Sequence, residues 1–245
     1  MLVRLGALLL VLIFFLTLTG RWLAVFTGPA LTLLRESYAL AGEPLVRELR
    51  DAVVQIYADG TGASGSGRRR GSGFNIEPFG LIVTNRHLVE NAALVRVSFS
   101  EQGTFLAERW VIYPQADLAL VYLDLEDSSL PVARLAGNEL PQVGEELLVI
   151  GNPLQFTRLA NRGELAGLRG QAGLEDPLLV IRAQLYPGSS GSPVFNEQGA
   201  VCGVVFAVAR GAEPEEAYGL ALPVAEVRRF LRAAGHHQDS ESLSD

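Results

Sequence analysis

The sequence contains no lysine, one cysteine and three histidines among its 245 residues. Without lysine, the chain has no Ser-Lys dyad, no Schiff-base lysine and no Walker-A phosphate loop. The lone Cys202 cannot form an intrachain disulfide, and no Cys/His spacing indicates a zinc site. Two histidines, His236 and His237, lie in a polar C-terminal stretch. Histidine chemistry in the folded body therefore depends on His87 alone.

Positive charge is also in the minority. The chain has 27 Asp and Glu residues against 20 basic residues, all of them arginine, which gives a formal charge of −7. This balance argues against a phosphate-binding surface, so we expect no nucleic-acid partner. Because 49% of the residues are hydrophobic, the chain is able to bury a sizeable core in one large or two small domains.

A long apolar run occurs at the N-terminus, where residues 5–19 follow Arg4 without a charge. The sixteen residues before Arg21 would span about 24 Å as a helix, less than the ~30 Å hydrocarbon core of a bilayer. Residues 1–28 are predicted to be a secretory signal peptide or an uncleaved signal anchor that contacts the membrane through residues 5–27. The lack of a clear Ala-x-Ala cleavage site favours the anchor. A buried helix of a soluble protein is a third interpretation.

Shorter helices are predicted on both sides of the body. Residues 29–50 are expected to form a tether and a short helix, with Pro44 opening the pattern PLVRELRD. Near the C-terminus, apolar residues at helical spacing predict a helix packed on the body: Val224, Val227, Phe230, Leu231 and Ala234. The charged residues between them are expected to face elsewhere: Glu226, Arg228, Arg229 and Arg232. Residues 236–245 are predicted to be a disordered tail.

Between residues 52 and 222, about twelve short apolar runs are separated by Gly, Pro, Asn or Asp. This pattern predicts an all-β fold, either a sandwich or a pair of barrels. No helical pattern alternates with the runs, which argues against a doubly wound α/β sheet. A break near residues 138–144 divides the body into halves at 51–140 and 141–235. The Gly/Ser-rich stretch 59–71 is predicted to be a mobile loop with solvated arginines.

Three short segments carry chemistry: TNRHLV at 84–89, QADLALVYL at 115–123 and PGSSGSPVF at 187–195. A serine nucleophile requires a base within hydrogen-bond distance, and imidazole is the usual one. The imidazole in turn requires a buried acceptor that fixes its tautomer. Each segment alone is typical of ordinary turns, caps and histidines in structural roles. Together, His87, Asp117 and Ser190 provide a base, an acceptor and a nucleophile.

The turn around Ser190 also suits the stabilisation of an oxyanion. Such a charge requires two backbone N–H groups that converge on one point. Glycine accepts the unusual dihedral angles that a turn of this kind needs. The predicted donors are the backbone N–H groups of Gly188 and Ser190.

The segments GSGFNIEPFGLIVTNRHLV, YPQADLALVYLD, VIGNP and PGSSGSPVFN resemble the trypsin-like serine proteases of bacterial HtrA (Deg) type. The resemblance extends from about Ala52 to Pro223. It implies a chymotrypsin-like double β-barrel with the catalytic residues between the barrels. It also implies that His87 is the general base, Asp117 its orienting partner and Ser190 the nucleophile. No metal or other cofactor is expected, because the nucleophile belongs to the protein.

Several features depart from the family pattern. HtrA proteins usually carry a PDZ domain after the protease, and only about 22 residues follow Pro223, so no PDZ domain is expected. The family turn is commonly Gly-Asn-Ser-Gly-Gly, whereas this chain has Ser189 and Ser192 on either side of its Ser190-Gly191 pair. Trimers are common in the family, and a homo-oligomer is left open here.

Substrate preference is encoded in the residues that should form the wall of the acyl-side pocket. Four residues are predicted to bind substrate: Leu185, Tyr186, Phe206 and Val208. None of them is a buried acid that would favour a basic side chain. We expect cleavage after small or medium apolar residues, unless the polar group of Gln184 reverses that preference.

The leading hypothesis is a serine endopeptidase that acts on exported, unfolded or misfolded polypeptides in protein quality control. The predicted location is the bacterial cell envelope, with the protease domain on the periplasmic side, or outside the cell if the N-terminal segment is cleaved. The alternative is a protease-fold binding or sensor module that holds peptides without cutting them. An esterase of the α/β-hydrolase kind does not fit, because that fold requires the order Ser, Asp, His.

Overall fold

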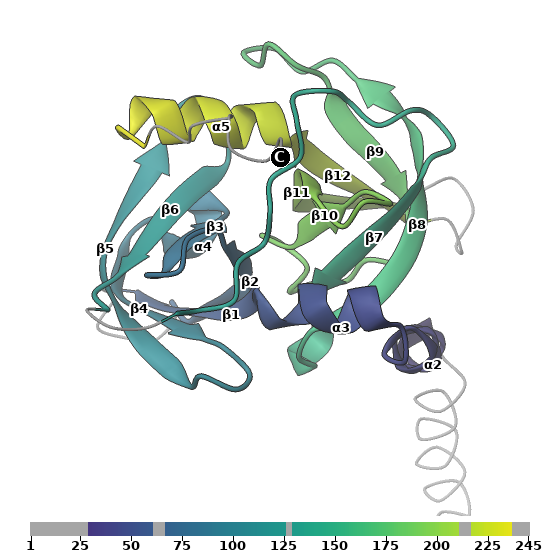
Figure 1. The fold of residues 1–245 in the computed structure, drawn as a ribbon. Coiled ribbons are helices and arrows are strands. Elements are labelled where there is room, and N and C mark those ends of the chain that lie inside the picture. The colour runs from purple at the N-terminus through teal and green to yellow at the C-terminus, as the bar shows by residue number, and fades with distance from the viewer. Residues whose placement is uncertain (1–28, 61–66, 126–128, 211–216, 237–245) are drawn as a thin grey trace, which may run out of the picture.

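In the computed structural model, the described residues are 29–60, 67–125, 129–210 and 217–236. Their strands close into two six-stranded barrels that lie beside each other (Figure 1). Every strand pairing within the two barrels is antiparallel. This arrangement confirms the predicted all-β double barrel and decides between the sandwich and the barrel pair.

The first barrel has the strand order β1-β2-β3-β6-β5-β4. Its strands are β1 Val53–Gly60, β2 Arg69–Asn75, β3 Leu81–Thr84, β4 Ala92–Ser98, β5 Thr104–Tyr113 and β6 Leu118–Leu123. Burial alternates along β4, where Val95 and Val97 are buried while Leu94 is exposed, as expected for a barrel with one face toward a core. One short helix, α4 Arg86–Val89, lies between β3 and β4.

The second barrel has the order β10-β11-β12-β9-β8-β7. Its strands are β7 Glu146–Gly151, β8 Leu159–Arg169, β9 Leu178–Arg182, β10 Pro193–Phe195, β11 Val201–Arg210 and β12 Ala217–Pro223, with a 3₁₀ turn at Pro153–Gln155. Its core is the larger of the two apolar clusters and extends to residues of the first barrel and of the C-terminal helix α5 (Val224–Ala233), including Phe74, Leu120 and Phe230. The two barrels and α5 therefore share one continuous apolar cluster.

The segment between β6 and β7 contacts both barrels. Ala133 N donates to Asn75 O of β2 (2.8 Å), and Ala136 N donates to Val201 O of β11 (2.9 Å). In Figure 1 this connection runs between the barrels. The break predicted near residues 138–144 falls within this connecting segment.

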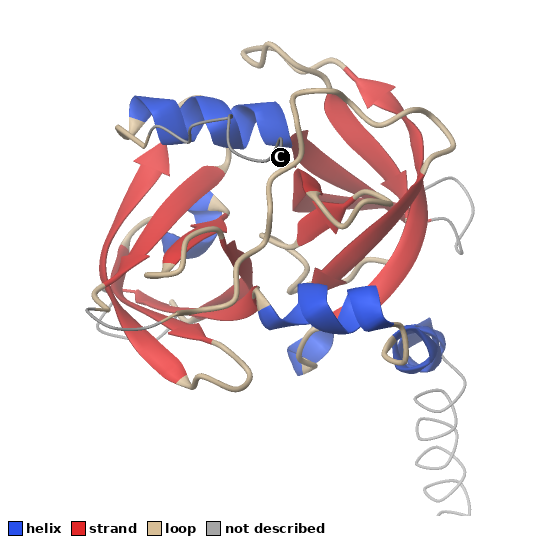
Figure 2. Ribbon diagram, in the orientation of Figure 1, coloured by secondary structure: helices blue, strands red, loops and turns tan. Residues whose placement is uncertain are grey.

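Two helices precede the first barrel, α2 Pro29–Leu40 and α3 Pro44–Asp51. The Ser37 hydroxyl of α2 accepts a hydrogen bond from Ala160 N of β8 (3.1 Å) and another from the Arg50 guanidinium of α3 (2.9 Å). The segment predicted to be a tether and a short helix is therefore two helices packed against the second barrel (Figure 2).

Helix α5, Val224–Ala233, lies across both barrels (Figure 1). Its Phe230 ring stacks on Tyr113 of the first barrel at a centroid distance of 4.8 Å. Val224, Val227, Phe230 and Leu231 are buried, as predicted. The prediction that Glu226 faces away from the body is wrong, because this side chain is 2% exposed. Arg229 compensates its buried charge by donating to Glu226 Oε1 (2.7 Å).

The prediction of a solvated arginine loop at residues 59–71 is also wrong in part. Strand β2 begins at Arg69, so only Arg68 of the three arginines precedes it, and that residue pairs with Asp59 (2.9 Å). No helix within the described ranges is long and apolar enough to cross a membrane. The predicted signal or anchor at 1–28 and residues 237–245 of the predicted tail lie outside the described residues. The prediction is wrong for the first residue of that tail, because the His236 ring stacks on Tyr122 at a centroid distance of 5.6 Å.

Candidate active site

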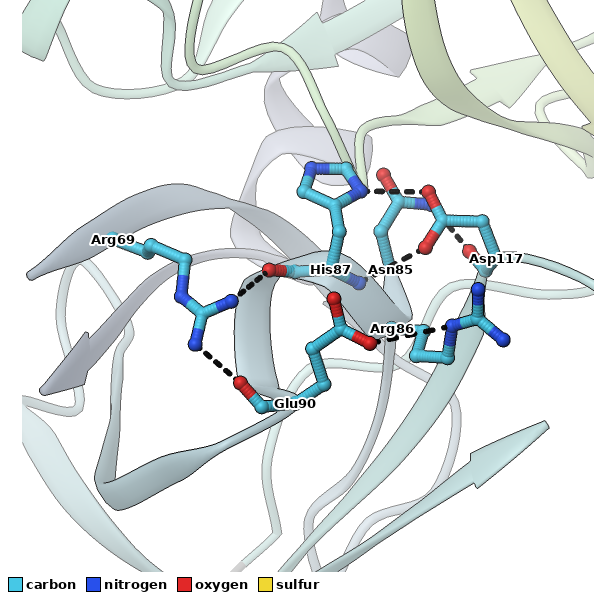
Figure 3. Close-up of polar contacts among 6 residues, drawn as sticks. All are labelled: Arg69, Asn85, Arg86, His87, Glu90 and Asp117. Atoms are coloured by element: carbon cyan, nitrogen blue, oxygen red, sulfur yellow. Dashed lines mark hydrogen bonds and ion pairs between the residues drawn. The ribbon is translucent and has the colours of Figure 1, made fainter. Parts of the chain in front are cut away.

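His87 lies in the short helix α4, directly after β3 and not at the strand end itself. Asn85, the residue before the helix, has an extended backbone and donates through Nδ2 to Asp117 O (2.8 Å). On the opposite side of α4, the Arg69 guanidinium donates to His87 O (2.7 Å) and to Glu90 O (Figure 3). A helix of four residues has too few internal hydrogen bonds to be stable alone. Contacts from β2 and from the residue before β6 therefore hold α4, and with it the histidine.

Asp117 contacts His87 at two points. Its Oδ2 lies 2.6 Å from the ring Nδ1, and its Oδ1 accepts a hydrogen bond from the backbone N–H of the same histidine (2.9 Å). Figure 3 shows the ring turned toward this carboxyl. An ionised carboxylate only accepts, so Nδ1 carries the proton in the neutral ring and Nε2 has a free lone pair.

Burial by itself raises the pKa of the Asp117 carboxyl, but the hydrogen bonds from the His87 ring and backbone together outweigh it, with a further contribution from the nearby Arg86 charge. The pKa of Asp117 is therefore lower than usual. A lowered folded-state pKa means that the carboxylate stabilises the fold above its unfolded pKa of about 3.9. This contribution is lost as the pH falls through the lower folded-state value.

We expect Asp117→Asn to reveal this linkage in acid. The difference in the free energy of unfolding between the two proteins should be constant from pH 7 to about 5 and should shrink as the pH falls further. Urea unfolding at a series of pH values measures this difference. A difference that stays the same down to pH 2 would contradict a lowered pKa for Asp117.

Ser190 lies in a tight turn that the backbone holds on both sides. Within the turn, Ser192 N donates to Ser189 O (3.0 Å), and Gly191 N donates to Val205 O of β11 (2.8 Å). Ser190 O accepts from Ser72 N of β2 in the first barrel (2.8 Å). The turn therefore belongs to the second barrel and is fastened to the first.

Gly71 of β2 brings this turn and helix α4 together. A Cβ atom at Gly71 would lie 2.4 Å from Leu88 Cδ1, in the helix that carries His87, and 3.0 Å from Ser190 O. Both elements pack against the same point of the strand, and any larger residue there would push them apart. The structure thus places His87, Asp117 and Ser190 around one strand. The hydrogen bonds of the described residues join His87 to Asp117 and include none between the Ser190 hydroxyl and the imidazole.

The peptide between Pro187 and Gly188 is turned so that its N–H is free. Pro187 O accepts from Leu154 N (3.0 Å), and a trans peptide directs its N–H away from its carbonyl. Among the described residues, neither Gly188 N nor Ser190 N has an acceptor. Gly188 has φ of +101°, and a Cβ there would lie 2.5 Å from Asn152 O. Only glycine fits this position.

Sequence reasoning missed the residues that connect the two barrels at this site. The Ser72 hydroxyl donates to Gly188 O (2.9 Å) and accepts from Asn152 N (2.9 Å). Asn152 Nδ2 donates in turn to Val54 O of β1 (2.8 Å). Both residues are buried polar side chains, and such side chains are usually hydrogen-bonded. The one local feature that could have identified them is a neighbouring glycine, in GSG for Ser72 and in GNP for Asn152.

The four predicted substrate-binding residues differ in their surroundings. Leu185 is 6% exposed, and its Cδ1 would lie 2.4 Å from a Cβ on Gly219, so this side chain fills space inside the second barrel. Tyr186 and Phe206 are half-buried, and Val208 is 43% exposed. Arg182, at the end of β9, forms an ion pair with Glu164 of β8.

Arg69 gives a first test of how α4 is held. Replacing Arg69 with methionine removes both hydrogen bonds to the helix end while keeping an apolar chain of similar length. For the general-base role predicted for His87, we expect kcat to fall about 10- to 100-fold with little change in KM, because small misplacements of a catalytic group cost rates of this size. Arg68→Met is the matched control, since Arg68 is exposed and pairs with Asp59. Equal kinetics in the two variants would show that Arg69 does not position His87.

Comparison with known proteins places this geometry in a family. Residues 71–204, more than half of the chain, match the family of trypsin-like peptidase domains. The putative serine protease HhoA of Synechocystis sp. is 32% identical over 68% of this chain and 44% of that protein. A probable periplasmic serine endoprotease, DegP-like, of Pseudomonas savastanoi pv. phaseolicola is 31% identical over 66% of this chain and 35% of that protein. The chain thus spans less than half the length of these relatives.

Solved structures of serine proteases have a similar fold. The serine endoprotease from Yersinia pestis matches 77% of this chain and 64% of its own, with a TM-score of 0.65 and 26% identity. An HtrA-type protease solved with a tripeptide covers 79% of this chain and 63% of its own, with a TM-score of 0.67 and 22% identity, which bears on the fold alone. The chain therefore belongs to the family of trypsin-like peptidase domains, and HtrA-type serine proteases are its homologues.

Proposed function

We propose that this chain is a serine endopeptidase in which His87 is the general base, Asp117 orients it and Ser190 is the nucleophile. The observation that carries the proposal is the two-point contact of Asp117 with His87, beside a serine turn fastened to the same strand. The family comparison supports the same reaction class.

In the proposed reaction, His87 Nε2 takes the hydroxyl proton as Ser190 Oγ forms a bond to the carbonyl carbon of the substrate. The π electrons of that carbonyl move to its oxygen, which becomes an oxyanion. The imidazolium then gives its proton to the departing amine as the C–N bond breaks. Water repeats the sequence to release the acyl group, with His87 again accepting and returning one proton.

The oxyanion would be stabilised by the N–H groups of Gly188 and Ser190. Both donors lie in the backbone and have no acceptor among the described residues, so no competing hydrogen bond must be broken when charge develops. A donor of this type contributes about 10²- to 10³-fold to kcat. Asp117, whose pKa is lowered, stays ionised at neutral pH and stabilises the imidazolium.

The substrates we propose are exported polypeptides in an unfolded or misfolded state, because relatives at this level of identity are named periplasmic endoproteases. A cell-envelope location, a membrane anchor and self-association are part of the same proposal. Cleavage after small or medium apolar residues is supported by the way Leu185 fills the space beside Gly219.

Fluorophosphonate labelling of the full chain tests the proposal, because the probe reacts only with an activated serine. The two serines on either side of the Ser190-Gly191 pair provide matched controls. Labelling should disappear in Ser190→Ala and persist in Ser189→Ala and Ser192→Ala, both of which change side chains buried in the turn. Folded protein that takes up no label, yet binds peptides, would instead favour the peptide-binding module. That alternative is supported by one observation: the described hydrogen bonds include none between the Ser190 hydroxyl and the imidazole. Active sites without bound substrate, however, often lack this hydrogen bond.

A further inference from the structure

A groove of about 270 Å³ opens beside the Ser190 turn. Its lining comes from both barrels: Gln55, Arg70, Asn152, Leu154, Pro187 and Gly188. Gly188 is one of these lining residues, so the groove adjoins one of the two free N–H groups. None of the residues that we expect to bind the acyl side of the substrate is part of this lining.

The position of the groove identifies the half of the substrate that would enter it. On one side the serine turn is fastened to β11 through Gly191 N and Val205 O, and the expected acyl-side residues Phe206 and Val208 follow on that strand. On its other side the turn is fastened to β2 through Gly188 O and Ser72 Oγ. We therefore expect a bound peptide to place the residue before the scissile bond along β11. The residues after the scissile bond would then pass Gly188 and enter the groove.

Of the two uncharged polar side chains in the groove lining, Gln55 presents a free donor, whereas the polar atoms of Asn152 are already bonded. The Tyr57 hydroxyl donates to Gln55 Oε1 (2.6 Å), which leaves the Gln55 amide NH₂ free to donate. Asn152 uses its Nδ2 on Val54 O and its Oδ1 on Arg158 N. No carboxylate is among the lining residues.

Arg70 supplies the charge of the groove. Its side chain is exposed, and its guanidinium lies over the Tyr57 ring at 5.3 Å from the centroid. Arg68 and Arg96 both pair with Asp59, whereas Arg70 has no acidic partner within the described ranges. The aromatic ring restricts the guanidinium without neutralising it. An unneutralised guanidinium beside further N–H donors favours a carboxylate, which it can bind with two hydrogen bonds.

We infer that this groove selects a carboxylate in the leaving half of the substrate, within the first two residues after the scissile bond, and that Arg70 is the residue that selects it. Arg70 directly precedes Gly71, whose Cβ position lies 3.0 Å from Ser190 O, so its side chain reaches only the first residues of the leaving half. The carboxylate comes from an Asp or Glu side chain or from the C-terminus of a substrate. This inference rests on the proposed endopeptidase function.

Internally quenched peptides with one acyl half and different leaving halves test the inference. Glu, Gln or Lys is placed at the first or second position after the scissile bond, and a parallel pair ends there in a free carboxylate or an amide. We expect kcat/KM for Glu to exceed that for Gln by about 3- to 10-fold at one of the two positions, with Lys lowest, as for a partly exposed charged hydrogen bond. The ratio should fall as salt is raised. The free-acid and amide pair shows whether a C-terminal carboxylate is accepted as well as a side chain.

Arg70→Gln should bring the Glu-to-Gln ratio close to one, whereas Arg68→Gln, two residues earlier in the chain, should leave it unchanged. A ratio near one in the unmodified protein, or a ratio that survives Arg70→Gln, would overturn the inference. Affinities of the same peptides for Ser190→Ala separate this result from failure of the proposed function. If no peptide is cleaved, a Glu preference in binding that Arg70→Gln removes still supports the groove, and equal affinities reject it.

Discussion

Replacing Ser190 with alanine is expected to abolish peptide hydrolysis. The fall in kcat should be on the order of 10⁶-fold, the size found when the nucleophile of a serine protease triad is removed. The substitution deletes only the attacking oxygen. The turn itself is held by backbone atoms, including the Ser190 carbonyl that accepts from Ser72 N, and alanine keeps all of them.

The folded state should therefore be unaffected by this substitution. We expect unchanged thermal unfolding and unchanged peptide affinity, measured beside initial rates on a quenched peptide. Ser192→Ala is the matched control, because the Ser192 hydroxyl is buried without a hydrogen-bond partner in the described structure. Its removal should be close to neutral for both stability and rate. Turnover in the Ser190 variant that is comparable with the unmodified protein would reject the mechanism.

Replacing Asp117 with asparagine is expected to lower kcat about 10⁴-fold at neutral pH, as in the general Ser-His-Asp case. The carboxylate accepts from both Nδ1 and the backbone N–H of His87, one bond to each oxygen. An asparagine has only one oxygen for these two donors. If its NH₂ faces the ring, the imidazole must present an unprotonated Nδ1 and carry its proton on Nε2, where it cannot accept from serine.

The loss should appear in kcat more than in KM, since Asp117 is neither part of the groove lining nor one of the residues expected to bind the acyl side of the substrate. Glu90→Gln is the matched control, because Glu90 is the acid that directly follows the same short helix, and among the described residues its carboxylate pairs with Arg86 alone, across 3.6 Å. This variant should retain full activity. If Asp117→Asn kept near-normal rates, another group would have to orient the imidazole.

Much of this arrangement follows from the sequence. Short apolar runs separated by Gly, Pro and Asn predicted the strands, since period-two burial and turn chemistry are local properties. The same locality predicted α3 and the buried face of α5. The candidate base, acceptor and nucleophile were found because a catalytic triad needs specific side-chain types, and the sequence offers one histidine in its body. Their roles in catalysis stay predictions until the variants are measured.

Other features depend on contacts between residues far apart in the chain. Glu226 was expected to face away from the body, but Arg229, which donates to its Oε1, makes its burial tolerable. Arg69 and Arg70 looked like a solvated loop, whereas β2 carries one to the end of α4 and the other to the groove beside Gly188. Neither destination has a signature within a few residues of the arginines themselves.

The sequence by itself determined where the strands are expected and which side chains are candidates for acyl transfer, because both depend on local pattern and chemical type. The tertiary structure decided that the strands close into two barrels, that Gly71 is the point where α4 and the serine turn meet, and that Arg70 has no acidic partner in the described part. The physical reason is distance along the chain. Ser72 bonds to Gly188 and Asn152 across intervals that only closure of both barrels can bring together.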